Sequence, residues 1–334
     1  MNHNMEHKQK RTFGISGNEG ITKAIRSSTF GVFLILFILC AILSIAATST
    51  FLTTSNLLSV FRQISFISIA AIGVTLVIIT GGIDLSLGSV YGLSGVACAI
   101  AMVNWQLGVI PGILFGVAVG GLCGLINGAL VTKVNFPPFI ATLGMMSAAR
   151  GVAYGITNGY PIYGLSKSFK TMGQDSFLGI PIPILVMLCI AVIVAFFLRK
   201  TTTGRRIYAI GGNEEASRVS GVDTVKVKLF VYIVCGMLAG FAGILTASRL
   251  GTAQPAAGLG LELNAIAAVI IGGASLSGGV GNIAGPVMGA AIMGVLNNAI
   301  TLLGINAYWQ NAVIGTVIIL AIMFDKVRTS KSRL

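Results

Sequence analysis

Charged residues are scarce in this sequence. Only 9% of its 334 residues are Asp, Glu, Lys or Arg, whereas 55% are hydrophobic. A soluble domain carries about a quarter charged residues, because its surface must be compatible with water. The mean hydropathy of +0.92 points the same way. The shortage of charge excludes an ordinary soluble protein and indicates a chain whose surface mostly faces hydrocarbon.

Side chains that commonly perform catalysis or hold metals are also few. The histidines, His3 and His7, both lie in the N-terminal tail, and no nucleophile, base and orienting group form a recognisable set. No glycine-rich loop ends in Gly-Lys-Ser/Thr, so we do not expect the chain itself to hydrolyse ATP. The five cysteines lie in apolar runs without metal-site or disulfide spacing. They are Cys40, Cys98, Cys123, Cys189 and Cys235. The sequence predicts no catalytic residue, no cofactor and no metal.

Long stretches without charge take the place of these groups. Residues 27–61, 85–132 and 263–324 contain no Asp, Glu, Lys or Arg. One crossing of a bilayer needs about 20 apolar residues, so the longest stretch must hold more than one helix. Helices satisfy their own backbone polar groups in lipid. We therefore predict an all-α, polytopic integral membrane protein with about ten transmembrane helices. They are expected near residues 30–49, 58–80, 87–103, 109–131, 138–157, 180–198, 228–249, 262–276, 283–303 and 307–324.

Basic residues gather in particular flanks of the apolar runs. They precede the first run, crowd the stretch 199–228 and end the chain. Excess Lys and Arg in short flanks marks the cytoplasmic side, whereas nucleic-acid binding would need a basic face on a soluble domain. We therefore expect no nucleic-acid partner. The predicted organisation is a cytoplasmic tail at 1–29, a transmembrane domain at 30–326 with its cytoplasmic loop at 199–228, and a cytoplasmic tail at 327–334.

Two glycine-rich segments resemble each other. Gly-Gly-Ile-Asp-Leu-Ser-Leu-Gly at 81–88 and Gly-Gly-Ala-Ser-Leu-Ser-Gly-Gly at 272–279 are identical at five of eight positions. Glycine-interrupted apolar segments in corresponding halves are typical of the broken helices that line a transporter's central pathway. Close helix packing through small residues is the alternative. The pattern predicts two pseudo-repeated halves, each with a broken Gly-rich segment.

Polar residues in and near these segments are candidates for a substrate pathway. A carboxylate at membrane depth is costly and suggests function, yet Asp is also a strong N-cap, and Ser275 replaces Asp84 in the second copy. We favour capping for Asp84 over direct substrate contact. Glu262 suits a helix N-terminus, and Arg249 lies across a short hairpin as its expected structural partner. The full candidate set is Asp84, Ser86, Asn127, Glu262, Asn264, Ser277 and Asn297.

Residues 201–228 differ from their apolar surroundings. Asn213 is a good N-cap, two glutamates follow it, and Ser220-Gly221 offers a C-terminal stop. Glu214 and Arg218 have the i, i+4 spacing of an ion pair on a helix surface. We predict a helix of about two turns, which is either a connector or a docking helix that transmits motion from a soluble partner.

In combination, these segments resemble the permease family of ribose-type ATP-binding-cassette importers. The resemblance extends from about residue 50 to Asp325. Its motifs are the 81–88 segment, Gly-Arg-Arg-Ile-Tyr-Ala-Ile-Gly-Gly-Asn-Glu-Glu-Ala-Ser-Arg-Val-Ser-Gly at 204–221, Ala-Ser-Arg at 247–249, Ala-Gln-Pro at 253–255, Glu-Leu-Asn-Ala-Ile-Ala-Ala-Val-Ile-Ile-Gly-Gly at 262–273 and Leu-Asn-Asn at 296–298.

The resemblance implies a non-catalytic subunit of the bacterial inner membrane that imports a monosaccharide, with both termini cytoplasmic. Ribose is the first expectation; xylose, allose, galactofuranose and autoinducer-2 are alternatives, and an ion-coupled secondary sugar transporter is the rival class. The implied partners are a cytoplasmic ATPase, an extracytoplasmic sugar-binding protein, a second copy of the chain in a homodimeric pore, and membrane lipid. The implied contacts with the ATPase are Gly211, Gly212, Asn213, Glu214, Glu215, Ala216, Ser217, Arg218, Ser220 and Gly221.

Overall fold

The computed structural model describes residues 28–306 and, beyond them, 309, 312–316, 319–320 and 323. Within this part of the chain nearly all regular structure is helical, and the strands form one hairpin of two strands with two residues each. The all-α membrane fold predicted from the sequence is confirmed.

Nine apolar helices of the described chain coincide with the first nine predicted spans. They are α2 (Ser28–Ala46), α3 (Thr54–Ile79), α4 (Leu87–Val103), α5 (Val109–Thr132), α6 (Pro138–Thr157), α8 (Ile182–Lys200), α11 (Thr224–Leu250), α12 (Leu261–Ile271) and α13 (Ala284–Leu302). By length and composition α3, α5, α6, α8, α11 and α13 can each cross a membrane, while α2, α4 and α12 are shorter apolar helices. Half of the tenth predicted span, 307–324, the first 27 residues of the predicted N-terminal tail and the whole predicted C-terminal tail lie outside the described residues.

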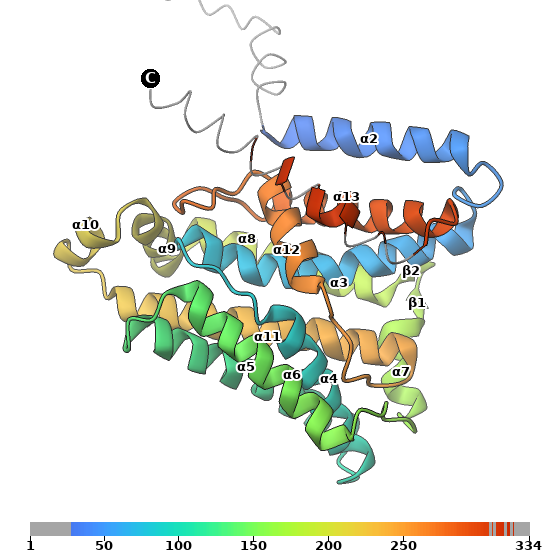
Figure 1. The fold of residues 1–334 in the computed structure, drawn as a ribbon, viewed down its shortest axis with the longest axis horizontal. Coiled ribbons are helices and arrows are strands. Elements are labelled where there is room, and N and C mark those ends of the chain that lie inside the picture. The colour runs from blue at the N-terminus through green and yellow to red at the C-terminus, as the bar shows by residue number, and fades with distance from the viewer. Residues whose placement is uncertain (1–27, 307–308, 310–311, 317–318, 321–322, 324–334) are drawn as a thin grey trace, which may run out of the picture.

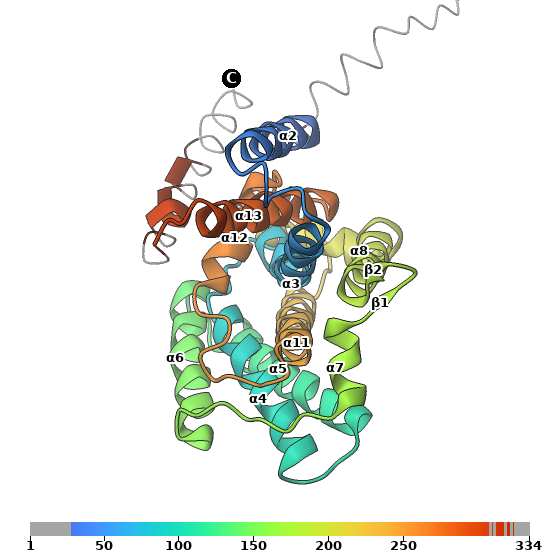
Figure 2. The ribbon, with the colours of Figure 1, turned by 90° about the vertical axis from the view of Figure 1, so that its right-hand side faces the viewer.

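Helices α2, α3, α11 and α13 run roughly along one direction, which is horizontal in Figure 1, whereas α4 and α6 slope across it and α12 is steeply inclined. Seen along that direction, α3 and α11 occupy the middle of the bundle and the other helices surround them (Figure 2). Burial agrees with this arrangement: the apolar window of α3 is 89% buried, whereas that of α8 is only 17% buried. The central helices therefore form the core, and the peripheral helices leave apolar faces open to the surroundings.

Glycines allow α5 and α11 to pack with their backbones in contact. A Cβ placed at Gly236 of α11 would overlap the carbonyl oxygen of Gly120 on α5, and one at Gly120 would overlap the carbonyl oxygen of Gly236. A Cβ at Gly124 would likewise overlap the carbonyl of Tyr232. Small residues at helix contacts in membranes permit such close approach, where dispersion forces drive association.

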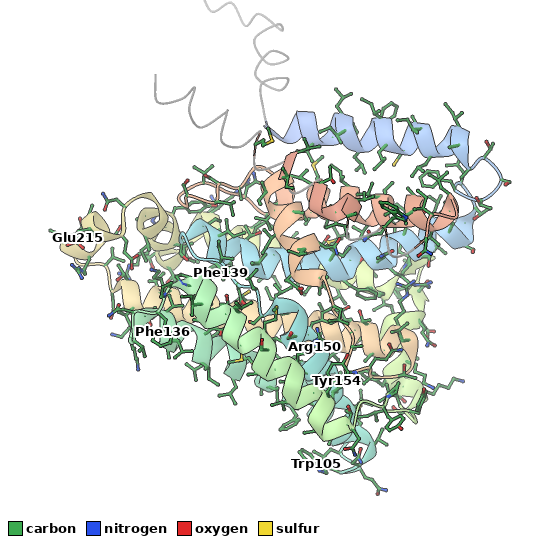
Figure 3. All side chains as sticks on the ribbon, viewed as in Figure 1. Trp105, Phe136, Phe139, Arg150, Tyr154 and Glu215 are labelled. Carbon is green, nitrogen blue, oxygen red and sulfur yellow. The ribbon has the colours of Figure 1, made fainter. Side chains whose placement is uncertain are left out.

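The two ends of the bundle carry different polar elements. At one end, here the α10 end, lie α9 (Thr202–Gly212) and the short α10 (Glu214–Val219), on the left of Figure 1. At the other, the hairpin end, lie α7 (Lys167–Gln174) and the strands β1 (Ser176–Phe177) and β2 (Ile180–Pro181). The aromatic side chains divide in the same way: Phe136 and Phe139 lie toward the α10 end, and Trp105 lies toward the hairpin end (Figure 3). Trp residues such as Trp105 are typical of a membrane interface.

Candidate functional site

Both glycine-rich segments stop a helix in the same way. At the end of α3, the Gly82 amide donates to the Val77 carbonyl (3.0 Å) and Gly81 has φ +79°. At the end of α12, the Ala274 amide donates to the Val269 carbonyl (3.2 Å) and Gly273 has φ +89°. A glycine at positive φ followed by this amide-to-carbonyl bond is the Schellman helix end, which a residue with a Cβ disfavours. In structure Gly81 is therefore equivalent to Gly273, one residue later than Gly272, with which the sequence alignment pairs it.

Asp84, Ser86 and Asn127 form one buried polar cluster between α3, α4 and α5. The Asp84 carboxylate accepts bonds from the Ser86 amide (2.8 Å) and hydroxyl (2.6 Å). The Asn127 side chain donates to the same hydroxyl at 2.8 Å. All three residues are buried, and Asn127 Oδ1 has no hydrogen-bond partner within the described chain. The cluster thus brings a carboxylate, a hydroxyl and an amide together inside the helix bundle.

Asp84 also stabilises the start of α4. Its carboxylate binds the amide two residues further on, directly before Leu87 begins the helix, so it satisfies a backbone donor in the way of an Asx-turn. The second copy has a weaker version, in which the Ser277 amide donates to Ser275 Oγ at 3.3 Å. No helix begins there; α13 starts later, at Ala284.

Arg150 of α6 ties three backbone segments together. Its Nη1 donates to the carbonyls of Pro255 (2.5 Å) and Ala257 (2.8 Å), and its Nη2 donates to that of Gly88 (3.0 Å). The loop 251–260 is thereby joined to the start of α4. Arg150 is not among the residues predicted from the sequence, although a lone cation inside a predicted span is itself a signal of function.

Glu262 lies near Arg150 and not beside its expected partner. A Cβ at Gly88 would overlap the Glu262 carboxylate, and Arg150 is close enough to act on that carboxylate electrostatically. The predicted pair of Glu262 with Arg249 is wrong. Arg249 instead donates to Ser59 Oγ at 3.0 Å, because α11 extends to Leu250 and points the guanidinium at α3.

The remaining candidates for the pathway lie on α12, on α13 and in the loop between them. Asn264, in the first turns of α12, donates to the Gly260 carbonyl at 2.9 Å, and its Oδ1 is buried without a partner in the described chain. Ser277 lies exposed in the loop between α12 and α13, and Asn297 is buried on α13. Since α13 packs mainly on α2, α3 and α12, whereas α4 packs mainly on α5, α6 and α11, the seven candidates do not form a single site.

The short helix predicted after Asn213 is present as α10. Asn213 Oδ1 accepts the Ala216 amide at 2.9 Å, and Gly221 has φ +84° beyond the helix end. The predicted Glu214–Arg218 pair is replaced by two others. Arg218 pairs with Glu215 at 2.7 Å, and Glu214 pairs with Lys228 of α11 at 2.7 Å.

Most of the predicted ATPase contacts lie on the surface of the α10 end. Gly212, Asn213, Glu214, Glu215, Ala216, Arg218, Ser220 and Gly221 are exposed. Glu215 lies at the outermost tip of α10 in Figure 3. Ser217 is instead buried, and Gly211 packs against the body of the protein. Beyond α10, Asp223 caps α11, and hydrogen bonds from the Lys226 amide and side chain lower the pKa of its carboxyl.

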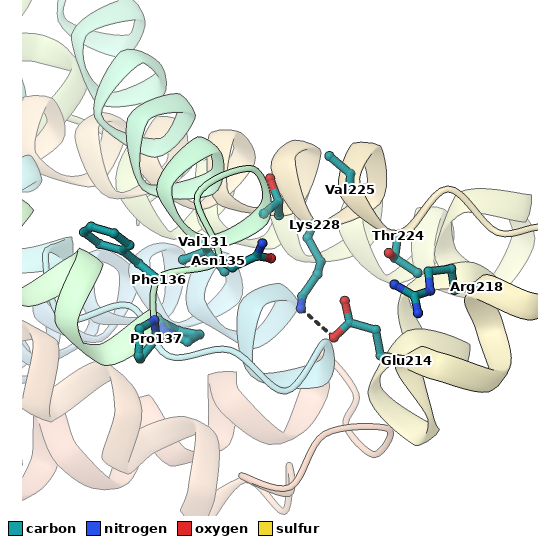
Figure 4. Close-up of a pocket in the computed structure, with 11 residues that line it drawn as sticks. Val131, Asn135, Phe136, Pro137, Glu214, Arg218, Thr224, Val225 and Lys228 are labelled. Carbon is teal, nitrogen blue, oxygen red and sulfur yellow. Dashed lines mark hydrogen bonds and ion pairs between the residues drawn. The ribbon is translucent and has the colours of Figure 1, made fainter.

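A cavity of about 540 Å³ separates α10 from the helices above it. Its lining comes from the α5–α6 loop, α10 and the first turns of α11, with the Glu214–Lys228 ion pair across it (Figure 4). No group of three or more His, Cys, Asp or Glu side chains suited to hold a metal occurs in the described part of the chain.

Comparison with known proteins yields one family and a set of curated relatives. The family described as the branched-chain amino acid transport system / permease component matches residues 56–322. The chain is 45% identical over 304 residues to the ribose import permease protein of Bacillus subtilis (strain 168), covering 90% of this chain and 93% of the relative.

Two relatives from Escherichia coli (strain K12) are also similar along most of their length. Its ribose import permease protein is 42% identical over 315 residues, covering 93% of this chain and 97% of that one. Its D-allose transport system permease protein is 39% identical over 297 residues, covering 89% and 91%. No solved structure matches the chain significantly.

Proposed function

We propose that the chain, which belongs to the family described as the branched-chain amino acid transport system / permease component, imports a monosaccharide, ribose, because its relatives include ribose import permeases. It is a multi-pass bacterial inner-membrane protein and a transport subunit. In the proposal, it forms the membrane pathway of an ATP-binding-cassette importer. The assignment of ribose as the substrate rests on the 42–45% identity to two ribose import permeases over at least 90% of this chain.

The α10 end faces the cytoplasm in this proposal. Basic residues gather at or near that end: Lys133, Arg199, Lys200, Arg205, Arg206, Arg218, Lys226 and Lys228. An excess of basic residues beside spans is retained on the cytoplasmic side. The hairpin end, with α7, β1 and β2, then faces the exterior, and both termini lie in the cytoplasm.

Partners occupy both ends and the flank of the bundle. An ATPase subunit docks on the exposed charged surface of α10, where Glu215 and Arg218 extend beyond the apolar body. A sugar-binding protein docks at the hairpin end. A second copy of the chain, together with lipid, covers apolar faces such as that of α5, of whose apolar window only 33% is buried.

Sugar would pass the buried polar cluster at the start of α4. Asp84, Ser86 and Asn127 lie where the chain is broken between α3 and α4, and Asn127 keeps an unpartnered oxygen there. Broken helices supply such polar groups near the midplane of transporters. The Glu262 carboxylate lies beside Gly88 of α4, and Asn264 follows Glu262 in the first turn of α12.

Reconstitution tests the proposal. Proteoliposomes holding the permease and its ATPase, with ATP on the α10 side, should accumulate radiolabelled D-ribose when binding protein is added to the hairpin side. Competition by D-allose, D-xylose and L-arabinose ranks the alternative sugars. Uptake by the permease alone under a pH gradient would instead establish the ion-coupled transporter, and protease access to residues 213–221 from outside intact cells would rule out cytoplasmic docking.

A further inference from the structure

The end of α9 meets both glycine-rich breaks at one point. The Gly279 amide, in the second break, donates to the carbonyl of Ile79, the last residue of α3, at 2.9 Å. Gly211 lies against this hydrogen bond so closely that a Cβ on it would overlap both the Ile79 oxygen and the Gly279 nitrogen. A Cβ at Gly278 would lie 3.0 Å from the Gly81 amide nitrogen and 2.8 Å from the Gly211 oxygen. Three backbone segments, remote in sequence, therefore touch without a side-chain layer between them.

Tyr208 adds a directed contact between α9 and the second break. Its hydroxyl donates to the Gly281 carbonyl at 2.8 Å. Burial raises the pKa of this hydroxyl above its usual range, so it remains a donor at neutral pH. Because Tyr208 and Gly211 lie on the same helix three residues apart, they present one face of α9 to the junction.

No flexible linker separates α9 from α10. Asn213 ends the first helix through its amide, which donates to the Ala209 carbonyl at 3.0 Å. The same residue begins the second helix, because its side chain accepts the Ala216 amide and its carbonyl accepts the Ser217 amide. A displacement of α10 therefore moves the end of α9 directly.

The other route from α10 into the membrane is loosely packed. There α10 faces the cavity of about 540 Å³, and the ion pair of Glu214 with Lys228 spans it. Glu214 is 47% exposed, and such partly hydrated pairs contribute little rigidity. Coupling between distant sites is carried by packed elements that have two arrangements, so the contact at Gly211 is the better candidate.

We propose that Gly211 and Tyr208 are the positioning residues through which movement of α10 reaches both glycine-rich breaks at once. The inference rests on the proposed function, in which an ATPase moves α10. Closing or opening the pathway then changes the Ile79–Gly279–Gly211 junction in both halves together, so the two breaks are coupled to each other as well as to the partner.

Paired variants of the full permease, reconstituted with its ATPase and binding protein, test this inference. Gly211→Ala adds a methyl group into the junction. Gly144→Ala adds the same group to an exposed glycine of α6, outside the proposed ATPase contacts, where nothing lies within 4 Å. Tyr208→Phe removes one hydroxyl and keeps the ring, so it guards against a Gly211 variant that fails to fold. The measurements are ATPase co-purification, ATP hydrolysis stimulated by ribose-loaded binding protein, and D-ribose uptake.

Uncoupling is the expected result. Gly211→Ala and Tyr208→Phe should retain the ATPase and hydrolyse ATP, while ribose taken up per ATP falls about five- to tenfold, within the usual range of coupling between sites. Gly144→Ala should transport at least about fivefold faster than Gly211→Ala. Uptake per ATP at the wild-type value in Gly211→Ala and Tyr208→Phe, or equal losses in the two glycine variants, would overturn the inference. A wild-type permease that recovers no ATPase would contradict the proposed function instead.

Discussion

Replacing Arg150 should loosen the loop 251–260, because this side chain ties the loop to α6 and to the start of α4. Arg150→Met removes two charge-assisted hydrogen bonds to the loop, at Pro255 and Ala257, and one to Gly88. A hydrogen bond to a charged group contributes about 1.5–3 kcal/mol. The guanidinium is only partly buried, so water replaces part of this, and we expect the two loop bonds together to contribute about 2–3 kcal/mol.

Hydrogen exchange measured by mass spectrometry on the purified permease reads this local stability directly. Because about 1.4 kcal/mol corresponds to a tenfold change, amide exchange in residues 252–260 should accelerate about 30- to 150-fold in Arg150→Met. Arg150→Lys, which keeps the charge but reaches fewer carbonyls, should lie between this variant and the wild type. Exposed Arg205 of α9 supplies the control, since Arg205→Met leaves the loop untouched.

Exchange in 252–260 within about threefold of wild type in Arg150→Met would refute the reasoning, because the loop would then be held by other contacts. The backbone pairing of Ala253 with Ile162 and the packing of Gly258 against Gly88 and Tyr91 are contacts that would remain. Equal acceleration in Arg205→Met would show a general loss of stability instead of a local one, and would refute it too.

Three further outcomes are expected. Glu214→Lys replaces the ion pair with Lys228 by two facing ammonium groups and reverses the charge on α10. ATPase co-purification should therefore be lost while membrane insertion persists. Normal recovery of the ATPase would contradict docking on α10. Asp84→Leu should lower the free energy of unfolding by about 1–3 kcal/mol, since it leaves Ser86 without its acceptor, whereas Asp84→Asn should cost less because Asn also caps; equal losses in thermal unfolding would show that the charge matters. Gly236→Leu should prevent α11 from reaching α5, and recovery of monodisperse protein at the wild-type level on gel filtration would argue against their backbone contact.

The sequence predicts the spans well because their signals are local. A charge-free apolar run limits where a helix can lie in a bilayer, and caps such as Asn213 and stops such as Gly221 fix an end from residue type alone. The same holds for the glycine-rich breaks, where Gly81 and Gly273 adopt a backbone conformation that other residues avoid.

Tertiary partners are what the sequence leaves open. Arg249 and Glu262 are close along the chain and opposite in charge, yet α11 and α12 point them at different neighbours. The partners of Arg150 are backbone carbonyls, which every residue carries, so no residue type marks them in advance. α9 is missed for a related reason: its face is defined by glycines that touch distant backbone, as at Gly211.

The glycine contacts of α11 with α5 and α4 limit how the molecule can change shape. Where Gly236 meets the backbone of α5, and where Gly243 meets the backbone of α4 at Tyr91, no side chains intervene that could rearrange or slide. Interfaces of this density shift as units and do not deform gradually. Helices α4, α5 and α11 must therefore travel as a single rigid block. Glycines join α12 to α13 equally closely, where Gly289 meets the backbone of Ala268, so any alternation of access falls on boundaries that side chains line, such as that between Gly294 of α13 and the Ile64 side chain of α3.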